Sequence, residues 1–191
     1  IVFVDYPELY FPRDVEWYAW LLQNHQKSKG IYLIFYKLEL NKPTMRWGDA
    51  VKVALCFGWI DSTVKSLGNG KRRQYFTHRN PKSVWSALNK RYIIDLEKNN
   101  QIHSSGYEKI TIAKQNGMWS YLDDVENLII PNDLKNAFNS NDLAFNNYQN
   151  FAPSYQKSYL YWLKQAKREI TRQDRINKII EYCNNNVKMR Q

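Results

Sequence analysis

Cysteine is scarce in this sequence, which has only Cys56 and Cys183 among its 191 residues. A secreted disulfide scaffold of this size carries more cysteines, so we expect two reduced thiols. A Cys56–Cys183 bridge stays open as the alternative until the geometry is known. The three histidines are scattered and none stands at metal-ligand spacing from a cysteine or carboxylate, so we predict no metal site and no cofactor.

Long apolar runs are also missing. No stretch approaches the roughly 20 residues that a membrane-spanning helix needs. The first four residues are apolar, but Asp5 and Pro7 follow at once, which is unlike the core of a signal peptide. We therefore expect a cytoplasmic protein without a transmembrane segment. The sequence also lacks a nucleophile–base motif, a phosphate loop and a dinucleotide fingerprint, so we predict no catalytic residue and lean against an enzyme.

Acidic residues are absent from Ser62 to Ile94, although the chain as a whole has 18 of them against 28 basic residues. This stretch contains eight basic residues, namely Lys65, Lys71, Arg72, Arg73, Arg79, Lys82, Lys90 and Arg91. The net charge of +10 is thus unevenly distributed, and such segregation creates a field that attracts anionic partners. The alternative is a basic stretch that serves solubility and pairs internally with acidic residues farther along the chain.

The first predicted element is a helix from Asp14, with a core face made of Val15, Tyr18, Ala19 and Leu22 at helical spacing. Strands are predicted next. The stretch from Ile31 to Lys37 is β-branched and aromatic. Two further runs, at residues 59–67 and 72–78, flank Gly68-Asn69-Gly70 and predict a β-hairpin.

After the hairpin the pattern becomes helical. Asn80-Pro81 predicts a helix start, and no strong strand candidate follows residue 80. Strands first and helices later predict an α+β fold: a small, mainly antiparallel sheet with a β-hairpin packed by helices, followed by an all-helical C-terminal portion. We expect an α+β domain over residues 1–125 and a helical region over 126–191, packed on the first as one unit.

Three sequence blocks are more specific than this general pattern. They read ALCFGWID at residues 54–61, FTHRNPKSVWS at 76–86 and YLYWLKQAK at 159–167. Together they resemble the bacterial YdeI/OmdA family, named for bacteriocin protection and OmpD association, from about Pro12 onward. The resemblance implies an α+β protein linked to resistance against antimicrobial peptides, and it implies no known reaction. Some members of the family are predicted to be periplasmic.

The first block supplies three pocket or motif candidates, Cys56, Trp59 and Asp61. The residues themselves favour a structural reading, in which Cys56 ends a buried helix and Trp59 begins a strand. A reactive thiol would need a cationic, partly exposed setting. We expect Asp61, which ends the apolar run, to pair with an arginine of the second block.

The second block and the hairpin supply the candidates for an anion or ligand site: Arg73, Arg79, Lys82, Trp85, Asn89 and Arg91. Guanidinium groups bind carboxylates and phosphates in a bidentate way, and a helix starting at Asn80-Pro81 would add free amide groups. We expect Arg79 to matter more than Lys71 for such binding. The basic C-terminal residues from Lys164 to Arg175 are read mainly as a solvated helix face.

Three functions are compatible with these features. The leading hypothesis is a non-enzymatic binding protein of the YdeI/OmdA type, associated with envelope stress or bacteriocin resistance, whose partner is a small anionic ligand or an anionic protein or envelope component. The first alternative is a nucleic-acid-binding protein, and the weaker one is an enzyme that uses Cys56 or Asp61. Direct capture of cationic peptides is disfavoured because a chain with a charge of +10 repels them.

Overall fold

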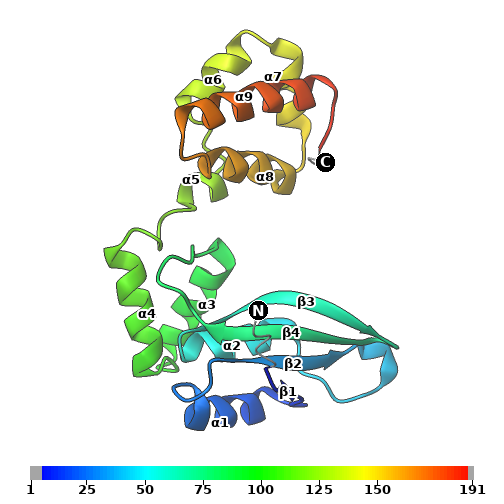
Figure 1. Cartoon of the computed structure of the whole chain (residues 1–191), viewed down its shortest axis with the longest axis vertical. Coiled ribbons are helices and arrows are strands. Elements are labelled where there is room, and N and C mark those ends of the chain that lie inside the picture. Colours follow the sequence, from blue (N-terminus) through cyan, green and yellow to red (C-terminus); the bar gives the residue numbers. More distant parts are fainter. Residues whose placement is uncertain (1–5, 189–191) are drawn as a thin grey trace, which may run out of the picture. The chain divides into compact units, whose positions relative to one another are not determined.

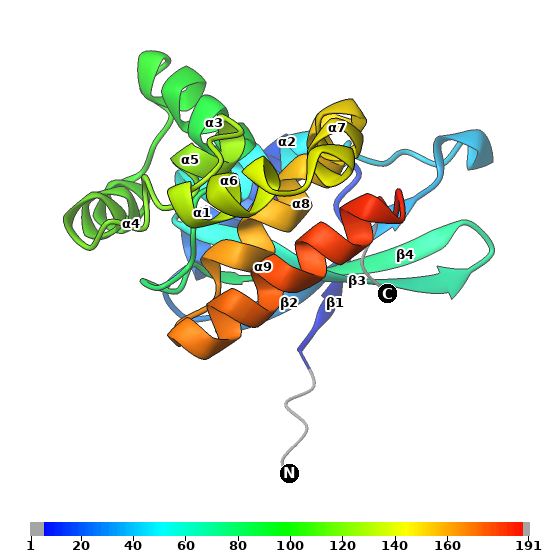
Figure 2. The ribbon, with the colours of Figure 1, turned by 90° about the horizontal axis from the view of Figure 1, so that it is seen from above.

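The computed structural model describes residues 6–188, which divide into two compact units, one up to Ser120 and one from Tyr121 onward. The first unit is α+β and the second is helical (Figures 1 and 2). This confirms the fold class. The elements of the first unit are β1 Glu8–Leu9, α1 Asp14–Asn24, β2 Gly30–Tyr36, η1 Leu38–Leu40 (a single 3-10 turn), α2 Trp47–Cys56, β3 Trp59–Gly68, β4 Lys71–His78, α3 Ala87–Lys98 and α4 Ser104–Gln115.

The sheet of the first unit has the strand order β1-β2-β4-β3. Its three long strands are antiparallel, with Leu33 opposite Gln74 and Trp59 opposite His78. The two-residue strand β1 pairs parallel to β2 and was not predicted, because a pair of residues carries no readable alternation. The predicted hairpin is confirmed: Asn69 and Gly70 adopt φ angles of 48° and 69°, which the left-handed turn requires.

One core joins the sheet to the helices of this unit. It contains Trp17 and Leu21 from α1, most of α2, the inward residues of β2, and Phe76 from β4. The predicted core face of α1 is wrong, because Val15 and Leu22 are 58% and 52% exposed. The helix instead turns Trp17 inward, since a tryptophan buries more apolar surface than either of those side chains.

The second unit is helical throughout the part of the chain that the structure describes. Its elements are α5 Asp123–Glu126, α6 Asn132–Asn139, α7 Asp142–Asn150, α8 Pro153–Lys164 and α9 Glu169–Asn184. A separate core holds Leu134, Phe138, Tyr148, Leu163 and Ile179, each at most 2% exposed. Within residues 6–188, none of the helices combines the length and the apolar character that a bilayer crossing requires.

Candidate functional site

Cys56 lies at the end of α2 and is 3% exposed. Its Sγ is 3.3 Å from the carbonyl oxygen of Lys52, one turn earlier in the helix. Burial raises the pKa of the Cys56 thiol to about 11, so the thiolate that a nucleophile needs is disfavoured at neutral pH. Cys183 is also buried, and both cysteines are unbridged thiols.

Trp59, at the start of β3, is fully buried in the core of the first unit. Its Nε1 donates a hydrogen bond of 3.2 Å to the carbonyl oxygen of His25, just after α1. Its ring meets those of Trp17 and Trp20 edge to face. These contacts make Trp59 a link between sheet and helix.

Asp61 follows two residues later and is half-buried. Its Oδ2 accepts a hydrogen bond of 2.8 Å from Nε1 of Trp47, and it accepts a second one from Nε2 of Gln74. No direct ion pair to Asp61 occurs among the ion pairs of the described residues. The expected interaction with an arginine of the second block is electrostatic only: burial lowers the pKa of Arg79, and the charge of Asp61 raises it. Two neutral donors hold the carboxylate in place of an arginine.

Arg79 is 3% exposed, which is exceptional for a charged side chain. Its guanidinium lies 3.6 Å from the ring centre of Trp85 and donates a hydrogen bond of 2.7 Å to the carbonyl oxygen of Val84. Its Nε and Nη1 have no hydrogen-bond partner among the described residues. Burial lowers the pKa of Arg79 to about 10, against the opposing effect of the Asp61 charge, so the group remains a cation at neutral pH.

The predicted helix start at Asn80-Pro81 is wrong, because α3 begins at Ala87. Residues 80–83 form a turn in which Asn80 uses both of its oxygens. The side-chain oxygen accepts from the amide of Lys82 at 2.8 Å, and the carbonyl accepts from the amide of Ser83 at 2.9 Å. The amide groups expected to meet an anion are therefore already engaged.

The helix start that does exist is capped by its own chain. The hydroxyl of Ser86 accepts a hydrogen bond of 3.2 Å from the amide of Asn89. Serine at this position is a strong cap, because it satisfies an amide that the helix leaves unpaired. The side chains of Lys82 and Arg91 are exposed to solvent. Their part in binding stays a prediction.

Arg73 lies on β4 and contacts a different set of residues from Arg79. Its Nη1 is 2.6 Å from Oε1 of Glu8, and its guanidinium lies 4.2 Å from the ring centre of Tyr32. Of the six anion-site candidates, the structure thus brings Arg79 and Trp85 into contact, whereas Arg73 binds at the β1 edge. The expected site does not form a single cluster around Arg79.

A different cluster of basic side chains gathers where the β3–β4 turn meets the segment after β2. Its members are Lys37, Lys42, Lys65, Lys71 and Arg72, and none of them makes an ion pair within residues 6–188. Figures 1 and 2 both place this turn at the end of the sheet remote from α3 and α4. We call this region, together with the apolar residues Leu38, Leu40, Val64 and Leu67, the hairpin-end surface.

Two cavities hollow the hairpin-end surface. The larger, of about 520 Å³, is lined by Lys37, Leu38, Val64, Lys71 and Arg72, among others. The second, of about 400 Å³, is lined by Leu40, Lys42, Leu67 and Lys71, among others. The cluster is not visible in the linear sequence, because Lys37 and Lys42 come from the first 61 residues, where acidic and basic residues are equal in number. The pairing of Tyr36 with Lys71 across β2 and β4 brings these segments together.

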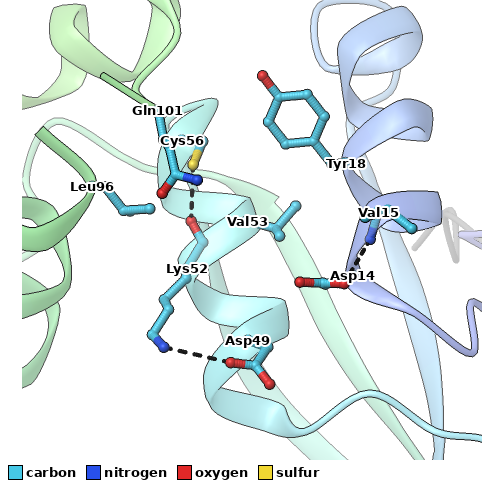
Figure 3. Close-up of a pocket in the computed structure, with 9 residues that line it drawn as sticks. All are labelled: Asp14, Val15, Tyr18, Asp49, Lys52, Val53, Cys56, Leu96 and Gln101. Atoms are coloured by element: carbon cyan, nitrogen blue, oxygen red, sulfur yellow. Dashed lines mark hydrogen bonds and ion pairs between the residues drawn. The ribbon is translucent and has the colours of Figure 1, made fainter. Parts of the chain in front are cut away.

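A third cavity, also of about 400 Å³, lies over α2 between α1 and α3 (Figure 3). Tyr18 and Val15 extend into it from α1, and Leu96 from α3. At its base, Nζ of Lys52 is 3.4 Å from Oδ1 of Asp49. The cavity also contains Asp14, whose carboxylate accepts a hydrogen bond from the amide of Val15, so its lining has two acidic groups and one basic group. No cluster of three or more metal-ligating side chains occurs in the residues that the structure describes.

The second unit has a smaller cavity of about 250 Å³, lined by Ile129, Leu160, Lys164 and Arg172, among others. The cations at its rim are paired. Nζ of Lys164 is 3.0 Å from Asp124, and Arg172 contacts Asp133 through two hydrogen bonds of 2.5 and 3.0 Å. Arg172 lowers the pKa of the Asp133 carboxyl, as expected for a bidentate ion pair.

Fold and surface together define an α+β protein of two compact units with a basic hairpin end. The chain belongs to the family described as a domain of unknown function (DUF8412), whose model matches residues 9–109. Residues 127–186 match a second model, described as Bacteriocin-protection, YdeI or OmpD-Associated (OmdA). No curated protein and no solved structure matches the chain.

These matches confirm the YdeI/OmdA resemblance for the C-terminal part of the chain, which contains the third block at residues 159–167. The coverage is narrower than expected, because the first two blocks fall within residues 9–109 and hence within the other family model. The helical unit is therefore the part of the molecule that resembles bacteriocin-protection proteins.

Proposed function

We propose that this chain is a non-enzymatic binding protein that holds an anionic partner at the hairpin-end surface. The observation that carries the proposal is a cluster of five basic side chains from separate segments of the chain, without an ion pair among the described residues. Four of them, Lys37, Lys42, Lys71 and Arg72, line two cavities. Charges that are not neutralised internally create a field that attracts and orients anions. Arg73, in contrast, contacts Glu8, and Arg79 is buried beneath Trp85.

The helical unit suggests the setting in which this binding operates. Residues 127–186 resemble proteins described by bacteriocin protection, so we place the chain in peptide resistance or envelope stress. The partner would be an anion of the cell and not the cationic peptide itself, because a chain with a net charge of +10 repels other cations.

A calorimetric titration with inositol hexakisphosphate tests the proposal. Replacing Lys37 and Lys71 with glutamine removes two cations that line the larger cavity, and we expect binding to weaken at least about tenfold. The matched control replaces Lys27 and Lys98, two exposed lysines elsewhere, and changes the net charge equally. We expect the control to bind nearly as the unmodified chain does.

Equal losses of affinity in the two double variants would mean that anion binding depends only on net charge. That result would contradict a specific site at the hairpin-end surface. A single-stranded oligonucleotide is titrated in parallel. Much tighter binding of the oligonucleotide, with a steep dependence on salt, would favour the nucleic-acid function instead.

A further inference from the structure

The basic residues of the hairpin-end surface are interleaved with exposed aliphatic side chains. Leu38 is 58% exposed, Leu40 45%, Val64 48% and Leu67 36%. Leu38 and Val64 line the larger cavity, and Leu40 and Leu67 line the other. Exposed apolar side chains thus lie among basic residues that make no ion pair within residues 6–188. Anion binding alone does not explain this arrangement, because contact with leucine adds no binding free energy for a small polar anion.

The backbone holds these side chains in place. The amide of Lys37 donates a hydrogen bond of 2.8 Å to the carbonyl oxygen of Gly70, which ties the segment after β2 to the hairpin turn. Leu40 packs directly on Gly70, where an added Cβ would lie 2.7 Å from the Cδ1 of Leu40. The apolar and basic groups are therefore presented by a connected structure.

We propose that the hairpin-end surface docks on an anionic phospholipid bilayer, with its leucines inserted at the boundary between headgroups and acyl chains. This inference rests on the proposed anion-binding function and names the partner. Peripheral membrane proteins combine the same two interactions. Their basic side chains attract the anionic headgroups, and their aliphatic side chains enter the apolar layer.

The composition of the surface favours lipid over other anions. Surfaces that bind single-stranded nucleic acid use aromatic rings on which bases stack. Here the four exposed apolar side chains are aliphatic. The aromatic residue that lines both cavities, Tyr36, is half-buried, and its ring is already in contact with Lys42 and Tyr10. Protein interfaces are depleted in lysine, which supplies four of the five cations here. Glu39 is the one acidic residue in the segments 36–42 and 64–72, so a negative surface meets little repulsion.

The test is co-sedimentation with vesicles of phosphatidylcholine alone and of phosphatidylcholine mixed with phosphatidylglycerol. We expect the full chain to bind the mixed vesicles and not the neutral ones. Replacing Leu38 and Leu67 with alanine should weaken binding to the mixed vesicles about tenfold and weaken binding of inositol hexakisphosphate by a much smaller factor. The matched control replaces Leu22 and Leu143, which are 52% and 61% exposed, and should bind as the unmodified chain does.

Insertion can also be observed directly. Because Cys56 and Cys183 are buried, the single exposed thiol of a Leu38→Cys variant can be labelled with a polarity-sensitive fluorophore. We expect its emission to shift to shorter wavelength on addition of mixed vesicles. The same label on a Leu143→Cys variant should not shift.

The outcomes separate this inference from the proposed function. Binding of inositol hexakisphosphate without binding of any vesicle would overturn the membrane inference and leave the anion site standing. Absence of both would overturn both. Vesicle binding that the two leucine substitutions do not weaken, with no emission shift, would make the association purely electrostatic and would overturn insertion.

Discussion

The thiol of Cys56 illustrates how a residue in a specific motif can be structural. It is buried at the end of α2, and burial raises its pKa to about 11. We expect a thiol reagent to label the folded protein slowly and both cysteines to react once guanidinium unfolds the chain. Cys56→Ser should lower the free energy of unfolding by about 1 to 3 kcal/mol, as for other buried polar replacements. Fast labelling of the folded protein would contradict a structural role.

His78 gives the first unit a dependence on pH. Its Nε2 lies 3.0 Å from the carbonyl oxygen of Ser28, and burial lowers its pKa, opposed by that hydrogen bond and reinforced by the charges of Lys109 and His25. Because the folded pKa is depressed, the unfolded chain binds more protons. Stability is therefore fully present above the unfolded pKa of about 6.5 and is lost as the pH falls below it.

Urea unfolding at neutral and mildly acidic pH measures this effect. We expect the midpoint to fall on acidification, and His78→Gln, which keeps a donor for Ser28, to reduce the fall. The lowered pKa of His103, which is also due mainly to burial, leaves some dependence in the variant. A variant with the full pH dependence of the unmodified chain would exclude His78 as its source.

Among the elements, the contact between α2 and α4 depends on a glycine. A Cβ added at Gly106 would lie 2.4 Å from the carbonyl oxygen of Cys56, and that oxygen belongs to backbone. The amide of His103 also donates a hydrogen bond of 2.9 Å to the same oxygen, which holds α4 close to α2.

We therefore expect Gly106→Ala to destabilise the protein by at least about 1 to 3 kcal/mol, as overpacking does. In an open helix the same change would stabilise it by up to about 1 kcal/mol. Thr111→Ala, an exposed position on the same helix, is the control and should change little. Stabilisation by Gly106→Ala in thermal unfolding would show that the helices separate at low cost.

The elements also show where sequence reasoning succeeds. The hairpin could be predicted because Gly68-Asn69-Gly70 favours a tight turn whatever the rest of the fold is. The start of α3 was misplaced because Asn80 makes the same local hydrogen bonds in a turn as in a helix cap. The inward face of α1 was misread because burial of Trp17 outweighs the spacing of Val15 and Leu22.

The candidate site depended on pairing that no local pattern reveals. Lys71 was visible in the acid-free stretch, but Lys37 and Lys42 belong to a segment of balanced charge. They join Lys71 only because β2 lies beside β4 in the sheet. The burial of Arg79 was equally hidden, since its neighbour Trp85 covers it from beyond the end of the strand.

At the scale of the molecule, the two units have separate cores. The one in residues 121–191 brings together α5 to α9 around Leu134, Phe138 and Ile179. We expect this segment, expressed alone, to be helical by circular dichroism and to unfold cooperatively, although a domain of this size is marginal. A segment without helical signal or without a cooperative transition would mean that its core depends on the rest of the chain.

The central claim is that anions bind at the hairpin end of the sheet. The most direct measurement is the change in backbone amide chemical shifts when inositol hexakisphosphate is added to the isotope-labelled protein. We predict the largest changes at Lys37, Lys42, Lys65, Lys71 and Arg72, decreasing as salt is raised. Changes centred on Arg79, Trp85 and Asn89, or no localised change at saturating anion, would contradict the claim.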